Sequence, residues 1–170
     1  MIICWFNGPS RDQLIERTPP QSIEIGCNHI ERRRAVNHVC AFDHEVVKAI
    51  KCLPGRQYHT RADSQHQGWN VIQDHMINGT NSGVLACWVA SRQEPQPIYI
   101  IGCDWGVTDQ SSDDHIYRKH GYRRKYTNAI SRTAQRILKD REVHVVSDQD
   151  PDVPWPVIST STFLSLTTNK

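Results

Sequence analysis

Residues 81–106 read NSGVLACWVASRQEPQPIYIIGCDWG, and this stretch decides the fold class. Its first part, from Ser82 to Arg92, has the length of a helix and is apolar on nearly every side, which predicts a buried helix. The apolar run from Ile98 to Cys103 then predicts a buried strand. A buried helix followed by a buried strand is typical of an α/β domain, in which helices cover a mostly parallel sheet.

Further strands and helices alternate outward from this stretch. Four more apolar runs predict strands and four more segments predict helices, so we expect one Rossmann-like α/β domain over residues 1–147, with helices on both faces of the sheet. The clearest of these helices, Arg123 to Asp140, carries Tyr126, Ile130 and Ile137 on one face. The other strands are expected at Ile2–Phe6, Ser22–Cys27, His38–Phe42 and Val143–Val146, and the other helices at Ser10–Arg17, His29–Val36 and His44–Lys51.

Two segments depart from this alternation. Residues 54–80 are polar and show no sustained period, which predicts an irregular insertion with at most one short strand, where a lid could sit. Residues 148–170 are rich in Pro, Ser and Thr, and we expect this tail to pack on the surface of the same domain.

The composition limits the class of protein. The chain has 170 residues, of which 38% are hydrophobic, which suits one soluble domain. Its net charge of +2 is too small to imply a polyanion partner by itself. With 18 acidic residues and 8% aromatic residues, a dedicated nucleic-acid module is not expected. No run approaches the roughly 20 apolar residues of a membrane span, and no basic-then-apolar leader is present, so we expect a cytoplasmic protein. The composition is compatible with either a monomer or a homo-oligomer.

The cysteines indicate buried, reduced thiols. None of the six forms a CxxC pair, and several lie in apolar strands or helices. Cys40 and His44 are spaced one helical turn apart, but no second ligand pair accompanies them, so we expect no metal site.

Polar residues follow the predicted strands at several points. Asn7-Gly8-Pro9-Ser10 follows the first strand and Asn28 ends the second, while Asn81-Ser82-Gly83 opens the buried helix. Because the carboxyl ends of parallel strands meet at one edge, these groups predict a crevice where a helix amino end offers N–H groups to a phosphate. Taken alone, the first loop is equally well explained as a turn with Ser10 as N-cap, since neither GxGxxG nor GxxxxGK[ST] is present. The predicted nucleotide cradle comprises Asn7, Gly8, Ser10, Asn28, Asn81, Ser82, Gly83 and Asp104.

A basic loop follows this crevice in the sequence. Residues 118–125 read RKHGYRRK, and guanidinium groups bind phosphate by paired hydrogen bonds. Candidate phosphate ligands are therefore Arg118, Lys119, Arg123 and Arg124, whereas Arg132, Arg136 and Lys139 are expected on a solvated helix face.

The motifs FNGPS, GCN and NSGVLACWVASRQEPQPIYIIGCDWG resemble the sialyltransferase-like family of bacterial surface-polysaccharide enzymes and the related hydroxymethylpterin pyrophosphokinase-like domains, over residues 2–147. The resemblance implies a CMP-sugar donor held by the predicted cradle, a general-base histidine at His115 or His120, and no required cofactor. Two positions differ from the family pattern. Gly79 stands where the family has a basic residue, and Trp105-Gly106 follows Asp104 where the family has tyrosines.

Three functions remain open from the sequence. The first is a nucleotide-sugar glycosyltransferase with an unidentified acceptor. The second is a phosphoryl or pyrophosphoryl transferase, in which Asp104 together with Asp109, Asp113 or Asp114 would hold Mg²⁺ between phosphates. The third is a non-catalytic nucleotide-binding protein of the same fold.

Overall fold

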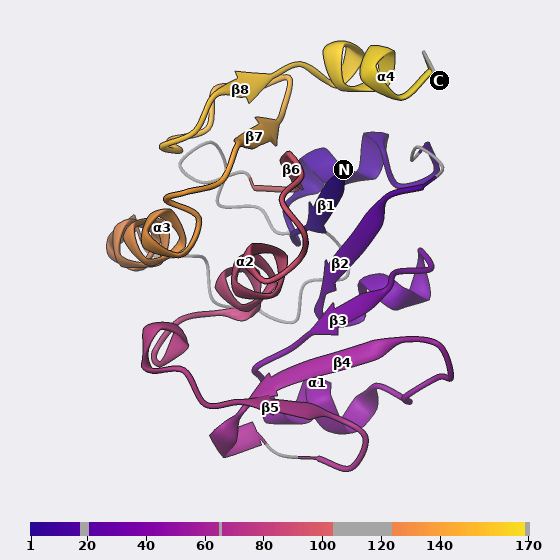
Figure 1. Ribbon diagram of the computed structural model, residues 1–170, viewed down its shortest axis with the longest axis vertical. Coiled ribbons are helices and arrows are strands. Elements are labelled where there is room, and N and C mark those ends of the chain that lie inside the picture. Colours follow the sequence, from indigo (N-terminus) through magenta and orange to yellow (C-terminus); the bar gives the residue numbers. More distant parts are fainter. Residues whose placement is uncertain (18–20, 65, 104–123, 169–170) are drawn as a thin grey trace.

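The centre of the molecule is an eight-stranded parallel sheet. The structure is a computed structural model that describes residues 1–17, 21–64, 66–103 and 124–168. The strand order is β5-β4-β3-β2-β1-β6-β7-β8 (Figure 1). The strands are β1 (Ile2–Trp5), β2 (Ile23–Cys27), β3 (His38–Cys40), β4 (Gln57–Arg61), β5 (Asn70–Ile72), β6 (Ile98–Ile101), β7 (Val143–Val146) and β8 (Val157–Ile158).

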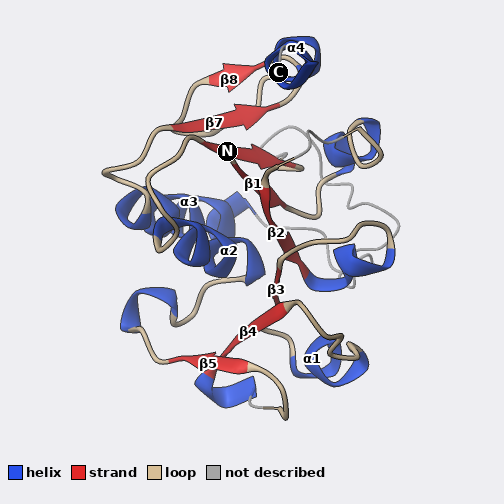
Figure 2. Cartoon of the chain, turned by 45° about the vertical axis from the view of Figure 1, so that its right-hand side comes forward, coloured by secondary structure: helices blue, strands red, loops and turns tan. Residues whose placement is uncertain are grey.

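Helices cover both faces of this sheet (Figure 2). One face packs against α2 (Ser82–Ser91) and α3 (Arg124–Ile137), and the other against α1 (His44–Ala49) and α4 (Thr160–Thr168). Strands buried on both faces carry continuous apolar runs, and this is why most of them could be found in the sequence. The predicted fold class, a Rossmann-like α/β domain with helices on both faces of a mostly parallel sheet, is confirmed.

The prediction for residues 54–80 is wrong, because this segment is not an irregular insertion. Its two strands β4 and β5 pair in parallel with the sheet and extend it beyond β3. β4 reads QYHTR, and its buried positions are Tyr58, His59 and Thr60, none of which is aliphatic. A strand with this composition has no apolar run to reveal it.

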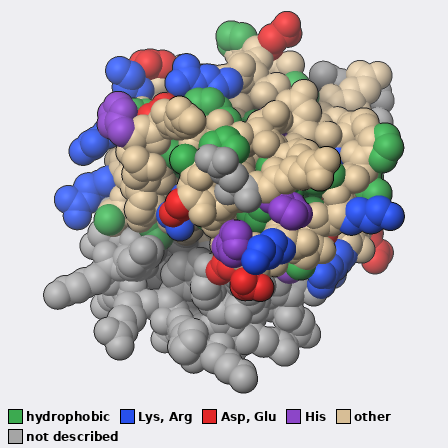
Figure 3. Space-filling view, turned by 90° about the horizontal axis from the view of Figure 1, so that it is seen from below, with side chains coloured by type: hydrophobic (Ala, Val, Ile, Leu, Met, Phe, Trp, Pro, Cys, Tyr) green, Lys and Arg blue, Asp and Glu red, His purple; other side chains and the backbone are tan. Residues whose placement is uncertain are grey.

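Seen from the side of β5, acidic and basic side chains are interspersed over the surface (Figure 3).

Two predicted helices are also wrong. Residues 10–17 and 29–36 form only the short 3₁₀ turns Pro9–Gln13 and Asn28–Arg32. The ten residues that link β2 to β3 leave little length for a full helix. In the C-terminal segment, β8 pairs with β7, and the ring of Phe163 in α4 packs against Tyr99 in β6.

Four thiols lie between α2 and the sheet. Cys4, Cys27 and Cys40 come from β1, β2 and β3, and Cys87 comes from α2. All four are free and buried, as predicted, and burial raises the pKa of Cys87 to about 12. Cys52 differs because it is partly exposed.

The strand order places a switch point between β1 and β6. From β1 the chain proceeds outward to β5, and it then returns to the other side of β1 as β6. The loops that follow β1 and β6 therefore diverge from the same place at the carboxyl edge. Such a point is where open α/β sheets form their ligand crevices.

Two buried histidines pair between β3 and β4. His38 Nδ1 lies 3.0 Å from His59 Nε2, and the two rings are stacked. Burial, together with the charge of His38, lowers the pKa of His59 to about 4, and burial also lowers the pKa of His38. The native state therefore holds this pair neutral at pH values where the unfolded chain is protonated.

The free energy of unfolding should consequently fall as the pH decreases. Above pH 6.5 His59 is neutral in both states, and between 6.5 and about 4 only the unfolded state takes up the proton. This linkage reaches up to about 3 kcal/mol. Urea unfolding should be measured between pH 7 and pH 4. Over this range the free energy of unfolding should fall less in His59→Gln than in the wild type, and the exposed His66→Gln is the control. Equal slopes in all three proteins would contradict the prediction.

Candidate functional site

The loops after β1 and β6 are held together at the switch point. Phe6 N–H donates to the carbonyl of Ile101 at 2.7 Å, and Gly8 N–H donates to the carbonyl of Gly102 at 2.8 Å. Gly102 has a φ of +79°, and a Cβ there would lie 2.7 Å from the Phe6 carbonyl oxygen. Only glycine permits this close approach of the two loops.

Ser82 joins α2 to the ends of two strands. Its hydroxyl donates to Asn28 Oδ1 at 2.8 Å and accepts from Phe42 N–H at 3.3 Å. Asn28 directly follows β2 in the left-handed region, with a φ of +53°, and only 5% of it is exposed. Because its Oδ1 faces Ser82, its Nδ2 group is directed elsewhere, and none of the described residues accepts a hydrogen bond from it.

The amino end of α2 adds donors beside Asn28. Asn81 is the N-cap, and its Oδ1 accepts from Val84 N–H at 3.1 Å. The N–H groups of Ser82 and Gly83 precede the intrahelical ladder, and the helix dipole is positive at this end. A Cβ at Gly83 would lie 2.9 Å from the ring of Phe6, so glycine lets the helix end approach the β1 loop.

A buried arginine supplies positive charge at the same edge. Arg11 lies in the turn after β1 and is 0% exposed. Its Nη1 donates to Asn7 Oδ1 at 3.0 Å and to the Phe6 carbonyl at 3.4 Å. The sequence interpretation missed this residue, because an arginine in a predicted helix over Ser10–Arg17 reads as solvent-exposed. No local signal distinguishes it from its neighbours.

The structure brings together part of the predicted cradle. Asn28 and Ser82 are in direct contact, Asn81 caps the same helix, and Gly83 packs on Phe6 next to Gly8. Asn7 is bound by Arg11. The alternative role of Ser10 as N-cap is wrong, because Gly8 holds that position without any side-chain cap.

Of the predicted catalytic and basic-loop residues, the structure describes only Arg124. Arg124 begins α3, and nothing further is described of its side chain. The remaining candidates lie outside the described residues, namely Asp104, Asp109, Asp113, Asp114, His115, Arg118, Lys119, His120 and Arg123.

The described residues contain neither a metal-binding cluster nor a membrane-spanning helix. In that part of the chain, no three His, Cys, Asp or Glu side chains are grouped so that they could hold a metal ion. None of its helices combines the length and the hydrophobicity needed to cross a membrane.

Comparisons with known proteins do not assign the chain to a family. The chain matches no protein-family model, and no curated protein or solved structure matches it significantly. The geometry of the carboxyl edge is therefore the basis for inferring the function.

This edge can bind an anion with polar substituents. Helix N–H groups, a buried guanidinium and an oriented amide gather around the ends of β1 and β2. Backbone N–H groups at a helix amino end bind phosphate and carboxylate oxygens. The side-chain N–H groups of an asparagine can donate to a ring nitrogen, a carbonyl or a hydroxyl of a ligand.

Removing the Ser82 hydroxyl should destabilise the protein. Ser82→Ala leaves Asn28 Oδ1 and Phe42 N–H without their buried partner, and we expect a loss of about 1–3 kcal/mol in chemical denaturation. Ser91→Ala is the matched control in the same helix, because its hydroxyl only bonds the Trp88 carbonyl. An equal effect of the two substitutions would contradict the bridging role of Ser82.

Proposed function

We propose that this protein is a nucleotide-sugar-dependent glycosyltransferase that binds a CMP-activated donor at the carboxyl edge of its sheet. The observation that carries the proposal is the buried Asn28, whose Oδ1 is fixed by Ser82 while its Nδ2 donates to none of the described residues. These N–H groups can therefore donate to an acceptor on a ligand. The FNGPS, GCN and NSG motifs, which resemble donor-binding motifs, supply the identity of the donor.

The nucleotide would be held by three kinds of contact. The donor phosphate would accept from the N–H groups of Ser82 and Gly83 at the amino end of α2. The buried charge of Arg11 favours an anion at this edge. The amides of Asn28 and Asn7 would bind polar groups of the ribose or the cytosine.

The proposed reaction proceeds by displacement at the sugar. The acceptor hydroxyl forms a bond to the anomeric carbon, the bond from that carbon to the phosphate oxygen breaks, and CMP leaves with the electron pair. His115 or His120 would take the hydroxyl proton. Arg118, Lys119, Arg123 and Arg124 would stabilise the leaving phosphate. The role of the histidine comes from the sequence resemblance, and the role of the four basic residues comes from their clustering in residues 118–125.

Ligand-dependent melting tests the binding step. CMP and CMP-sialic acid should raise the melting temperature without Mg²⁺, because a ligand at about 100 times its dissociation constant adds roughly 2.7 kcal/mol to the stability of the native state. For a chain of this size the shift is about 5–10 °C. A rise with ATP only when Mg²⁺ is present would favour phosphoryl transfer instead. No shift with any nucleotide would contradict the proposal.

The same assay tests the role of Asn28. Asn28→Asp replaces the unused Nδ2 donors by an acceptor with negative charge, so the shift with CMP should disappear. The exposed Asn70→Asp makes the same chemical change in β5, at the edge of the sheet and three strands away from β2, and should keep the full shift. A full shift in Asn28→Asp would show that the nucleotide binds elsewhere.

Release of CMP from CMP-sialic acid tests the chemistry. In single-turnover assays one of His115→Ala and His120→Ala should lower the rate by about 10²–10⁴-fold, while the other leaves it unchanged. Equal rates in the wild type and both variants would remove histidine from the mechanism. A wild type that binds CMP but releases none would be a non-catalytic binding protein.

A further inference from the structure

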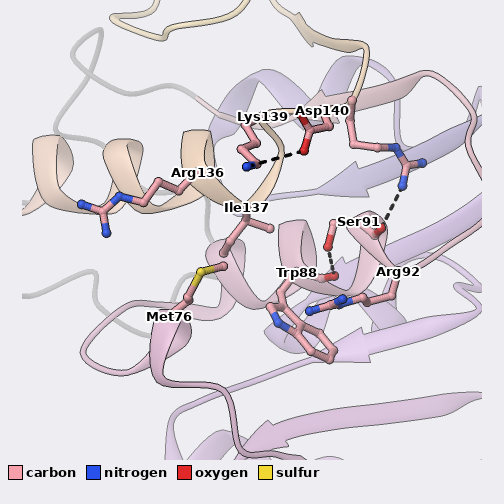
Figure 4. Close-up of a pocket in the computed structure, with 9 residues that line it drawn as sticks. Met76, Trp88, Ser91, Arg92, Arg136, Ile137, Lys139 and Asp140 are labelled. Atoms are coloured by element: carbon pink, nitrogen blue, oxygen red, sulfur yellow. Dashed lines mark hydrogen bonds and ion pairs between the residues drawn. The ribbon is translucent and has the colours of Figure 1, made fainter.

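A cavity of about 250 Å³ lies at the other end of α2 from the proposed nucleotide site (Figure 4). It is formed where the last turns of α2 and α3 meet the turn His75–Ile77. The ten residues of α2 separate it from Ser82 by about 15 Å. An inference about this cavity therefore does not depend on the proposed function.

One side of the cavity is apolar and rigid. It is made by Met76, Trp88 and Ile137, whose side chains lie close together in Figure 4. The indole of Trp88 is held in place because its Nε1 donates to Asp74 Oδ2 at 2.8 Å. The guanidinium of Arg92 lies over the indole ring, 4.9 Å from its centroid.

The lining also carries two cations, Arg92 beside the indole ring and Lys139 after the end of α3. Arg92 is 3.8 Å from Asp74 and Lys139 is 3.8 Å from Asp140, and both separations are too long for a hydrogen bond. Neither side chain donates a hydrogen bond to any described residue, so their N–H groups can bind an anion. Arg136 belongs to the lining as well, but its guanidinium points away from Arg92 in Figure 4.

Arg141 removes an obstacle to anion binding here. The carboxyl end of a helix carries partial negative charge, which repels anions. Arg141 caps the end of α2 by donating from its two terminal nitrogens to five carbonyl oxygens, those of Ala90, Ser91, Gln93, Glu94 and Gln96. The carbonyls that would oppose an anion are therefore already neutralised.

We propose that this cavity binds a small phosphorylated aromatic molecule. The ring would lie on the apolar wall of Trp88, Met76 and Ile137, and the phosphate would accept hydrogen bonds from Arg92 and Lys139. The volume lies below the about 300–1,000 Å³ of sites for drug-sized ligands, so the ligand is compact. Asp74 and Asp140 flank the two cations and disfavour an extended polyanion such as a nucleic acid.

Phenyl phosphate is the probe for this proposal. In the ¹⁵N-labelled protein the indole signal of Trp88, assigned with Trp88→Phe, should shift in a saturable manner with a dissociation constant of about 1 mM or below. Phenol, which lacks the phosphate, should bind at least about tenfold more weakly. Added KCl should weaken the binding of phenyl phosphate, because the contacts are charged. The absence of a saturable shift, or equal binding of phenol, would overturn the proposal.

A double substitution tests the two cations directly. Arg92→Gln together with Lys139→Gln should weaken phenyl phosphate binding by about tenfold or more. The matched control is Lys48→Gln together with Lys51→Gln, which removes the same charge from exposed positions in and after α1 and should leave the binding unchanged. The four side chains are exposed, so both variants should melt within a few degrees of the wild type. Unchanged binding in the Arg92/Lys139 variant, or equal weakening in both variants, would overturn the assignment.

Discussion

The burial of α2 is the constraint on which the rest of the structure depends. A helix that is apolar on nearly every side must be covered along its whole length, and both of its ends then need hydrogen-bond partners inside the protein. At the amino end Asn81 and Ser82 supply them through Val84 N–H and Asn28. At the carboxyl end Arg141 supplies them. This residue lies between α3 and β7, and its guanidinium donates hydrogen bonds to carbonyl oxygens at and after the end of α2.

The same constraint creates the two sites proposed for this protein. Because Ser82 satisfies Asn28 Oδ1, the amide of Asn28 has one fixed orientation and presents its Nδ2 donors at the carboxyl edge of the sheet. The switch point between β1 and β6 lies beside it, where Gly102 lets the two loops touch. At the opposite end Arg141 caps α2, and Arg92 and Lys139, which line the cavity there, donate no hydrogen bond to any described residue.

Much of this fold could be predicted from the sequence, for physical reasons that also explain the failures. Strands such as β1 and β6 are buried on both faces and therefore carry apolar runs, and Asn28 and Ser82 could be singled out because they stand at the ends of such elements. β4 could not, because the positions it buries include the neutral histidine His59. The burial of Arg11 and the hydrogen bonds of Arg141 were missed because they depend on partners that only the folded chain supplies.

The central claim is that the amino end of α2, together with Asn28, forms the nucleotide site. Mapping backbone and side-chain amide chemical shifts during a titration with CMP tests it most directly, because the experiment locates the ligand without assuming a reaction. The account predicts that the largest changes fall on the Asn28 side-chain amide, on Ser82 and Gly83, and on Gly8. Changes confined to Trp88 and Arg92, or no saturable change anywhere, would contradict it.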